Sequence, residues 1–343
     1  MVESREVKIA VDAMGGDFAP ENPVLGAVMA SEEYGIKIIL VGEQKALEAE
    51  LCKYSSRKDA IEIIHAEETI RMDEDALHAV RKKKKSSLKI AAELIKDKRA
   101  DGLVSAGNTG AMVAIMKVIV GTLKGVERPA LAILIPHLKG FSILIDVGAN
   151  VDCKALHLQQ FAIMGSIYAE EILKIEKPRV GLLSIGEEEI KGNELTKEVF
   201  KALKSTDCNF IGNIEGKDVY AGVVDVIVCD GFIGNIVLKV SESMVEAIEK
   251  MLREELSRTV WTKLGYALSR NAFKTFKKRL DYSEYGGAPM LGVDGIAIIC
   301  HGRSPAKAIK NAIRVAKDFA SHRLSDTIQQ KILQSREKAR INI

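Results

Sequence analysis

Cysteine, histidine and aromatic residues are all scarce in this sequence. The five cysteines form no CxxC pair and are odd in number, which disfavours both a disulfide framework and a zinc site. The six histidines form no HxxxH or HExxH pair, so we expect neither a metal nor another cofactor. Aromatic residues make up 5% of the chain and the net charge is only +3. We therefore expect no nucleic-acid partner, which would need base stacking and a strongly basic surface.

Long apolar runs and three familiar catalytic motifs are also missing. The first residues, MVESREVKIAV, contain no signal-peptide core, and no uncharged stretch approaches the roughly 20 apolar residues that cross a bilayer. We therefore expect a cytoplasmic protein. The sequence has no GxxxxGK[ST], no GxGxxG after its first apolar run and no GxSxG. These absences argue against a P-loop nucleotide hydrolase, a dinucleotide-binding enzyme and an α/β-hydrolase.

The chain does contain eight short apolar runs that end in turns rich in glycine, asparagine or aspartate. The turns begin with DAMGGD, Gly42, SAGNTGA, DVGAN, SIGEEE, GNIEG, DGFIGN and HGRS. Most of the runs are rich in Val and Ile and too short for helices, which predicts buried strands of a mostly parallel sheet with helices between them. Ligands of such sheets bind beyond the carboxyl ends of the strands, where these turns would gather. With no linker or repeat, we expect one domain over residues 1–343.

The composition of these turns indicates a site for an anion. Glycine lets backbone N–H groups approach a ligand closely, and the first turn of a helix favours negative charge. Glycine-flanked asparagines recur at Asn108, Asn150, Asn193, Asn213 and Asn235. A single Gly-Asn step is ordinary turn chemistry. Five of them, mostly at predicted strand ends, favour an anion-binding site.

Residues 236–280 are predicted to form a helical excursion without any strand. From Arg258 to Leu280 the chain has seven basic residues and no acidic one. On one helical wheel the basic face holds Lys263, Arg270, Lys274 and Lys277, and the opposite side holds Val260, Trp261, Leu264, Leu268, Phe276 and Leu280. A break is expected near Gly265 or Asn271. Such an amphipathic segment fits a lipid headgroup boundary, and it equally fits packing against a second subunit.

The run Arg81–Lys85 is the other concentration of charge. A solvated surface is the usual explanation of such a run. If the run is functional, it would bind an acidic partner.

Long motifs identify a family resemblance that covers nearly the whole chain. In this order, the sequence contains DAMGGDFAPEN, AVRKKK, SAGNTGA, DVGANVDCK, IGEEEIKGNELTKE, FIGNIEG, VCDGFIGNIVLK, DYSEYGGAPMLGVDG and HGRS. They closely resemble the acyl-acyl-carrier-protein:phosphate acyltransferase family of bacterial phospholipid synthesis. Two departures are Lys85, where the family usually has Asp, and Arg303, where Ser is common. These departures bear on carrier docking and on the loop of His301.

The resemblance implies a homodimeric, Rossmann-like α/β/α sandwich related in fold to phosphotransacetylases. It also implies conversion of a long-chain acyl-carrier-protein thioester and inorganic phosphate into acyl phosphate. The acyl phosphate would then feed a membrane glycerol-3-phosphate acyltransferase. We accordingly expect peripheral association with the inner face of the cell membrane.

Residues and resemblance together suggest how phosphate is held beside a thioester. Phosphate is already anionic, so positioning is the main task. The expected phosphate-binding residues are Gly15, Gly16, Gly107, Asn108, Thr109 and Gly110. Lys191 or Lys239 would offset the charge, and a donor such as Asn150, Asn193, Asn235 or His301 would stabilise the oxyanion. His301 could equally be an ordinary turn histidine. Asp12, Asp17 and Asp230 would repel phosphate, so they are expected to cap helices and orient loops.

Two surfaces are candidates for contact with the acidic carrier or with the membrane. The residues concerned are Arg81, Lys82, Lys83, Lys84, Trp261, Lys263, Leu264, Phe273, Phe276 and Lys277. Two alternative functions stay open. One is a phosphotransacetylase-like enzyme that uses a short acyl-CoA, and the other is a non-catalytic scaffold that recruits proteins to a membrane.

Overall fold

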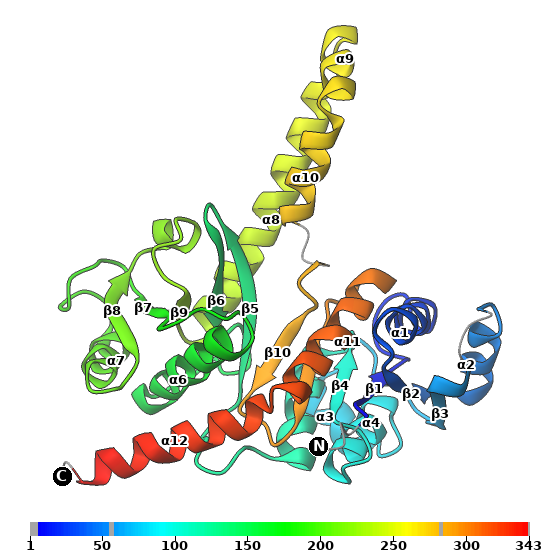
Figure 1. Ribbon diagram of the computed structural model, residues 1–343, viewed down its shortest axis with the longest axis horizontal. Helices are drawn as coiled ribbons and strands as arrows, with labels where there is room; N and C mark the ends of the chain where they lie inside the picture. Colours follow the sequence, from blue (N-terminus) through cyan, green and yellow to red (C-terminus); the bar gives the residue numbers. More distant parts are fainter. Residues whose placement is uncertain (1–5, 55–57, 281–283, 342–343) are drawn as a thin grey trace, which may run out of the picture.

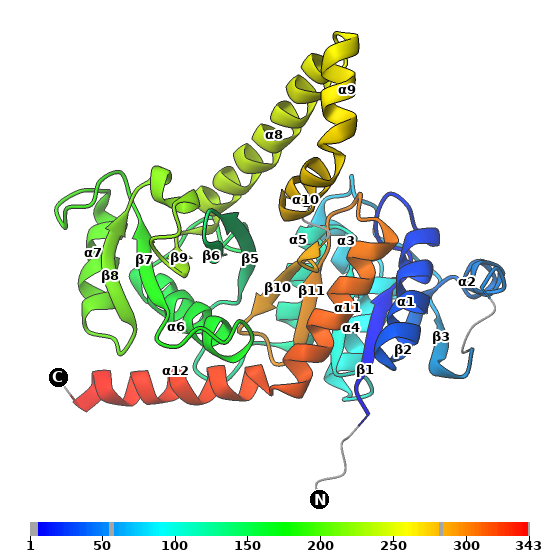
Figure 2. The ribbon, with the colours of Figure 1, turned by 45° about the horizontal axis from the view of Figure 1, so that its top comes forward.

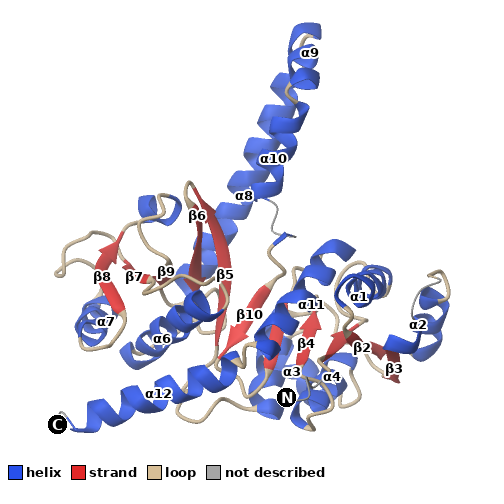
Figure 3. Ribbon diagram, viewed as in Figure 1, coloured by secondary structure: helices blue, strands red, loops and turns tan. Residues whose placement is uncertain are grey.

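The residues that the structure describes form one mixed sheet of eleven strands with helices on both faces (Figures 1 and 3). The computed structural model describes residues 6–54, 58–280 and 284–341. The strands are β1 Lys8–Asp12, β2 Lys37–Gly42, β3 Ile61–His65, β4 Gly102–Ser105, β5 Ala130–His137, β6 Gly140–Ile145, β7 Arg179–Leu183, β8 Asn209–Ile214, β9 Val226–Val228, β10 Ala288–Leu291 and β11 Ile296–Ile299. Their order across the sheet is β3-β2-β1-β4-β11-β10-β5-β6-β9-β7-β8.

The sheet has two parallel halves that run in opposite directions. In the first half β3, β2, β1, β4 and β11 are parallel, and in the second half β6, β9, β7 and β8 are parallel. The pairs β11–β10, β10–β5 and β5–β6 are antiparallel, so three successive reversals separate the halves. The predicted mostly parallel α/β sheet is confirmed. The expectation that all the strand-end turns gather at one edge is wrong, because the two halves point their carboxyl ends in opposite directions.

The helices cover both faces of the sheet and form a three-layer arrangement. They are α1 Glu21–Tyr34, α2 Gln44–Leu51, α3 Ala76–Lys82, α4 Ser87–Lys96, α5 Thr109–Ile115, α6 Ala155–Glu171, α7 Glu194–Lys204, α8 Gly231–Leu256, α9 Val260–Leu268, α10 Arg270–Leu280, α11 Ala306–Ser321 and α12 Leu324–Ile341. Side chains alternate across each strand. Ile9 therefore joins the core under α1, α6 and α11, whereas its neighbour Ala10 joins the core under α4 and α5. Helix α12 runs from the first half across to α6 in the second (Figures 1 and 2).

Most of the predicted helices are present, with two differences. The sequence predicts helices over about 21–34, 305–321 and 324–338, and these correspond to α1, α11 and α12, with bounds that differ by at most a few residues. The long helix predicted to follow Asn235 begins at Gly231 instead, because the Asp230 side chain accepts a hydrogen bond from the Ile233 N–H and caps it. The predicted alternation of strand and helix also fails between β5 and β6, which form an antiparallel hairpin.

Helices α8, α9 and α10 project away from the sheet (Figures 1 and 2). The break in the excursion falls at Ser269, between the two expected positions. Helices α9 and α10 fold back along α8 and leave a groove of about 560 Å³, lined by Ile248, Glu249, Leu252, Arg253, Leu256, Ser257, Lys263, Tyr266, Arg270, Phe273, Lys274 and Phe276. Phe276 thus lies on the same side as the basic residues, contrary to prediction. The prediction placed residues 258–280 on a single helical wheel. That wheel does not apply, because the chain breaks at Ser269 and α10 does not continue the helical periodicity of α9.

Candidate active site

A pocket of about 440 Å³ lies between the two halves of the sheet. Its walls come from the beginning of α5, the strand β5, the turn after β6, helix α8, the start of β10 and the end of β11. It is lined by Thr109, Gly110, Leu131, Ile133, Leu134, Val147, Gly148, Asn235, Leu238, Lys239, Glu242, Tyr285, Gly287, Ala288, Ile299, Cys300 and His301. The pocket therefore joins strand-end turns from both halves.

Five of the predicted site residues meet in this pocket. Thr109 and Gly110 belong to the first turn of α5, whose N–H groups have no carbonyl partner within the helix. Asn235 and Lys239 lie four residues apart on α8 and so share one face. His301 follows β11. Together they bring backbone donors, an amide and a cation to the lining of one pocket.

The pocket lining also includes aliphatic residues. Leu131 and Ile133 on β5, Leu238 on α8 and Ile299 on β11 contribute aliphatic side chains. A pocket with an apolar wall and a few convergent polar groups is typical of small-molecule sites. This one has the chemistry for an anion next to a hydrocarbon chain.

Glu242 and Cys300 line the pocket but were not predicted. Glu242 lies within one turn of Lys239 and binds its ammonium at 2.8 Å. Only the spacing of three residues on a helix could have indicated this pair. Burial raises the pKa of the Cys300 thiol to about 12, so the sulfur stays protonated at neutral pH. A protonated thiol is a poor nucleophile, which argues against an acyl-enzyme on Cys300.

The glycines of the first turn pack beneath this pocket without lining it. A Cβ at Gly15 would lie 2.8 Å from the Gly107 nitrogen, and one at Gly16, whose φ is +100°, would lie 3.0 Å from the Ala106 Cβ. The Asp17 N–H donates to the Gly302 carbonyl at 2.8 Å. The turns after β1, β4 and β11 are therefore in contact, and only glycine permits that approach.

Asp12 and Ser105 support the turn after β4 from below. The Ser105 hydroxyl donates to Asp12 Oδ2 at 2.7 Å and accepts from the Gly107 N–H at 3.0 Å. Burial raises the pKa of the Asp12 carboxyl, against hydrogen bonds that lower it. The Gly107 N–H is thus directed inward, which leaves Thr109 and Gly110 as the pocket-facing part of the predicted phosphate cradle.

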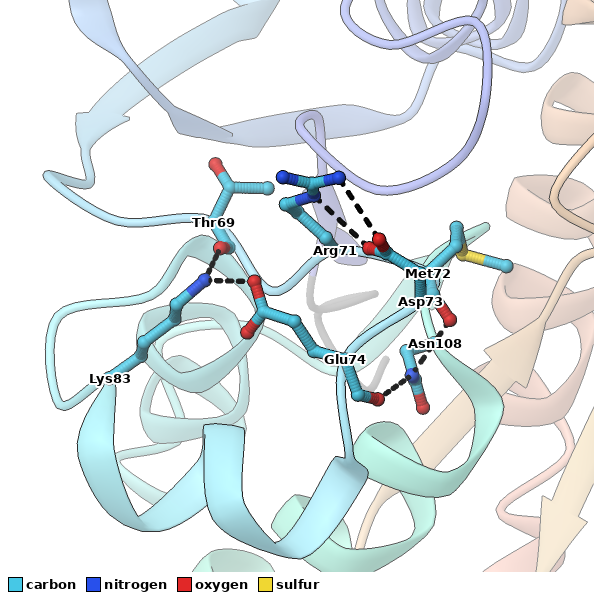
Figure 4. A network of polar contacts seen from close by, with 7 residues as sticks. All are labelled: Thr69, Arg71, Met72, Asp73, Glu74, Lys83 and Asn108. Atoms are coloured by element: carbon cyan, nitrogen blue, oxygen red, sulfur yellow. Dashed lines mark hydrogen bonds and ion pairs between the residues drawn. The ribbon is translucent and has the colours of Figure 1, made fainter.

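Asn108 caps α5 and holds a neighbouring segment (Figure 4). Its Oδ1 accepts from the Ala111 N–H at 3.0 Å. Its Nδ2 donates to the carbonyls of Met72 and Glu74 at 3.3 and 3.1 Å. The amide of Asn108 is therefore occupied on both sides, and this residue positions the beginning of α5.

Other predicted site residues lie outside the pocket lining. Asn150 is buried, and its Nδ2 donates to the Pro129 carbonyl and to Asp146 Oδ2. The Asn193 side chain caps α7 by accepting from the Thr196 N–H at 2.9 Å. Lys191 is exposed in the turn that precedes this helix. In the sheet β9 separates β7 from β6, so Lys191 and Asn193 in the turn after β7 lie farther along the sheet than the pocket-lining turn after β6.

The predicted contact surfaces are largely exposed. Arg81, Lys82 and Lys84 are exposed, whereas the Lys83 side chain is only 24% exposed. Trp261 is 81% exposed and Leu264 and Phe276 are about half exposed. Phe273 is half-buried beside Tyr266, with ring centroids 5.1 Å apart. The side chain of Lys277 lies outside the described residues.

Two classes of site find no support in the described part of the chain. No group of three or more His, Cys, Asp or Glu side chains there could hold a metal ion. No described helix combines the length and apolarity needed to cross a bilayer.

The bent mixed sheet with a pocket between its halves is the fold of the phosphotransacetylases. A phosphotransacetylase from Streptococcus pyogenes superposes with a TM-score of 0.63 at 18% identity, covering 93% of this chain and 94% of that one. The family described as "Fatty acid synthesis protein" matches residues 7–326, and the chain belongs to this family. Proteins named "Phosphate acyltransferase" share its sequence throughout. The one from Geotalea uraniireducens is 51% identical over 326 residues, covering 95% of this chain and 94% of the relative. The one from Pelotomaculum thermopropionicum is 52% identical over 326 residues, covering 95% of each.

Proposed function

We propose that this protein is a phosphate acyltransferase that moves a long-chain acyl group from acyl carrier protein to inorganic phosphate. The observation that carries the proposal is the pocket whose lining combines Thr109, Gly110, Asn235 and Lys239 with aliphatic residues of β5. The names of its relatives, at about half identity over nearly the whole chain, support the same activity.

In the proposed reaction a phosphate oxygen attacks the thioester carbonyl carbon. A C–O bond forms, the C–S bond breaks, and the thiolate leaves to take up a proton from solvent. A thiol has a pKa near 8.5, so the leaving group needs little acid help. No proton must be removed from phosphate, because it is already anionic. The protein therefore acts mainly by holding two reactants together.

Each polar group of the pocket has a place in this reaction. The N–H groups of Thr109 and Gly110 would bind phosphate at the beginning of α5. Lys239 would offset its charge while Glu242 holds the ammonium in place. Asn235 or His301 would donate to the oxyanion that forms on the carbonyl oxygen.

The same family resemblance supports a carrier-docking surface made of Arg81, Lys82 and Lys84. These three side chains are exposed around the end of α3, near the segment that Asn108 holds. An acidic carrier would be attracted to them across solvent. Lys83 is excluded from this surface because its ammonium is directed inward.

We further propose that the protein is a cytoplasmic homodimer that binds the inner face of the cell membrane reversibly. Exposed apolar residues recur every three or four positions along α8, at Phe232, Ile236, Val240, Met244, Ile248 and Met251. Such a stripe is suited to the same stripe of a second copy. Trp261 and Leu264 on α9 would enter the headgroup region, with Lys263 beside anionic lipid. There the product would pass to a membrane glycerol-3-phosphate acyltransferase.

The two alternatives make different demands on the molecule. The phosphotransacetylase fold is shared, but the apolar wall of the pocket favours a long acyl chain over acetyl. A scaffold would need the projecting helices and would not need a pocket that combines the Lys239–Glu242 pair with aliphatic residues. The acyl-transfer proposal therefore accounts for more of the structure.

One assay separates these possibilities. The purified protein is incubated with phosphate and with either palmitoyl carrier protein or acetyl-CoA, and acyl phosphate is trapped with hydroxylamine. We expect hydroxamate from the palmitoyl donor and far less from acetyl-CoA. The reverse preference would support the short-acyl alternative, and no product from any thioester would support the scaffold.

A further inference from the structure

Lys83 is the inward-facing residue of the basic run. Its Nζ donates to the Thr69 carbonyl at 2.6 Å and pairs with Glu74 Oε1 at 2.5 Å (Figure 4). The side chains of Lys83 and Glu74 are 24% and 27% exposed. The other four residues of the run 81–85 are all exposed. Lys83, at the end of α3, thus differs from its neighbours in the run because its side chain is directed inward and theirs are exposed to solvent.

The segment that Lys83 holds is the one that Asn108 holds from the other side. The Glu74 carboxylate binds Lys83, while the Glu74 carbonyl accepts from Asn108 Nδ2 at 3.1 Å. The Met72 carbonyl accepts from the same amide at 3.3 Å. One residue therefore connects the lysine to the cap of α5 (Figure 4).

This segment also packs directly against the walls of the pocket. A Cβ at Gly110 would lie 3.1 Å from the Ala76 Cβ, and one at Gly302 would lie 2.9 Å from the Met72 Cε. Gly110 lines the pocket, and Gly302 follows the lining residue His301. A shift of residues 69–76 would consequently displace both the turn of Gly110 and the turn of Gly302.

We propose that Lys83 is a positioning residue of the acyl-transfer site, acting through Glu74 and Asn108 on the turn that begins α5. This inference rests on the proposed function of the same pocket. The Lys83 ammonium anchors residues 69–76 at the Thr69 carbonyl and the Glu74 carboxylate. The carbonyls of Met72 and Glu74 in this segment orient the Asn108 amide. The amide in turn fixes the direction of the N–H groups of Thr109 and Gly110. Small displacements of such groups are costly to a reaction that depends on positioning.

The charge state of Glu74 agrees with this role. The hydrogen bond from Lys83 holds the pKa of the Glu74 carboxyl below its ordinary value, against the opposing effect of burial. The ion pair is thus intact throughout the neutral range.

The first test is Lys83→Gln, assayed with palmitoyl carrier protein and phosphate. We expect kcat to fall by about tenfold or more while the KM for the carrier stays within about twofold. Amide hydrogen exchange should become faster over residues 69–76 and 108–112. Lys82→Gln and Lys84→Gln should instead raise the carrier KM with a strong salt dependence. Lys96→Gln, an exposed residue of α4, is the neutral control.

Three further variants keep the test decisive. Glu74→Gln retains the backbone carbonyl and removes the charge, so it should lower kcat as Lys83→Gln does, and the double variant should be no worse than either. If Lys83→Gln does not fold, Glu74→Gln supplies the same comparison. The exchanged pair, Lys83→Glu with Glu74→Lys, should recover part of kcat.

A different pattern would overturn the proposal. If Lys83→Gln raises only the carrier KM, in the manner of Lys84→Gln, the residue is a docking contact. Unchanged kcat and unchanged exchange over 108–112 would likewise reject a positioning role. If the wild-type protein forms no acyl phosphate, the proposed function fails, while the exchange measurement still decides whether Lys83 controls the Asn108 turn.

Discussion

The hydroxyl of Ser105 donates to the buried carboxylate of Asp12 at 2.7 Å, directly beneath the turn that begins α5. This bond joins the carboxyl ends of β1 and β4. The Ser105 oxygen also accepts from the Gly107 N–H, so one buried carboxylate orients the turn through a single hydroxyl. Asp12 Oδ1 has no hydrogen-bond partner. The polar site therefore depends on a buried group that is held at some cost to stability.

Replacing Asp12 with Asn should stabilise the protein in a pH-dependent way. Burial raises the pKa of Asp12 in the folded chain, so folding favours the protonated form and wild-type stability falls as pH rises above the unfolded pKa. Asn carries no charge at any pH. The difference in unfolding free energy between Asp12→Asn and wild type should therefore grow from pH 4 to pH 7. Urea unfolding at several pH values measures it, with the exposed Asp97→Asn as control. A difference in unfolding free energy that stays constant with pH would show that the charge of Asp12 does not destabilise the folded protein.

Asn235 and Asn193 provide a matched pair for the oxyanion donor. Asn235 lines the pocket, whereas Asn193 caps α7 outside it. Asn235→Ala should lower kcat by about 10²-fold with little change in stability, because a donor to the transition state is lost. Asn193→Ala should lower stability by about 1 kcal/mol through loss of the cap. Steady-state kinetics and thermal unfolding of both variants make the comparison. If Asn193→Ala lowered kcat more than Asn235→Ala, Asn193 and not Asn235 would be the oxyanion donor.

The carrier-docking surface predicts an effect on KM that depends on salt. Reversing the charge of Arg81, Lys82 or Lys84 should raise the carrier KM by about fivefold each at low ionic strength, since an exposed pair contributes up to about 1 kcal/mol. The effect should shrink as salt screens the interaction. Lys201→Glu on α7, also exposed, serves as the control. If Lys201→Glu raised the carrier KM as much as reversal of Arg81, Lys82 or Lys84, the effect would come from net charge and not from docking.

The membrane proposal concerns the exposed apolar residues of α9 and α10. Replacing Trp261, Leu264 and Phe276 with Ser should abolish co-flotation with vesicles that contain anionic lipid, because the apolar residues that enter the bilayer are lost. Activity with carrier protein in solution should be retained. Ile185→Ser removes an equally exposed apolar side chain elsewhere, since Ile185 and Trp261 are both 81% exposed. Flotation that survives the triple replacement would favour burial of these residues in a dimer.

Sequence patterns predicted the elements of the fold better than their directions. The eight short apolar runs correspond to β1, β2, β4, β6, β7, β8, β9 and β11, because burial on both faces leaves a local signature. Strands β5 and β10 are not among these runs. The reversal between the two halves has no such signature. It depends on the β5–β6 hairpin and on β10 entering between β11 and β5, which are long-range pairings.

The site was predictable where it follows from the turn after a single strand. Asn108 and Thr109 were found because a strand, a glycine-rich turn and a helix follow one another in the sequence. Glu242 and the aliphatic wall were not found, since their role depends on the fold bringing α8 and β5 to one pocket. Lys83 and Lys84 are indistinguishable in a run of like charges. Only the position of the segment 69–76 shows which lysine is directed inward.

The aliphatic wall should set the preference for acyl-chain length. Ile133 lies on β5 and faces the pocket, so Ile133→Trp would fill part of the space assigned to the chain. A long acyl donor should lose about tenfold or more in kcat/KM, because a few displaced methylenes are worth 1 to 3 kcal/mol. An acetyl donor, which does not reach that wall, should be affected little. The ratio of hydroxamate formed from palmitoyl and acetyl donors measures the change. Ile211→Trp, at an exposed position on β8, is the matched control. If both donors lost activity equally, the β5 wall would be supporting the fold of the pocket and not the acyl chain.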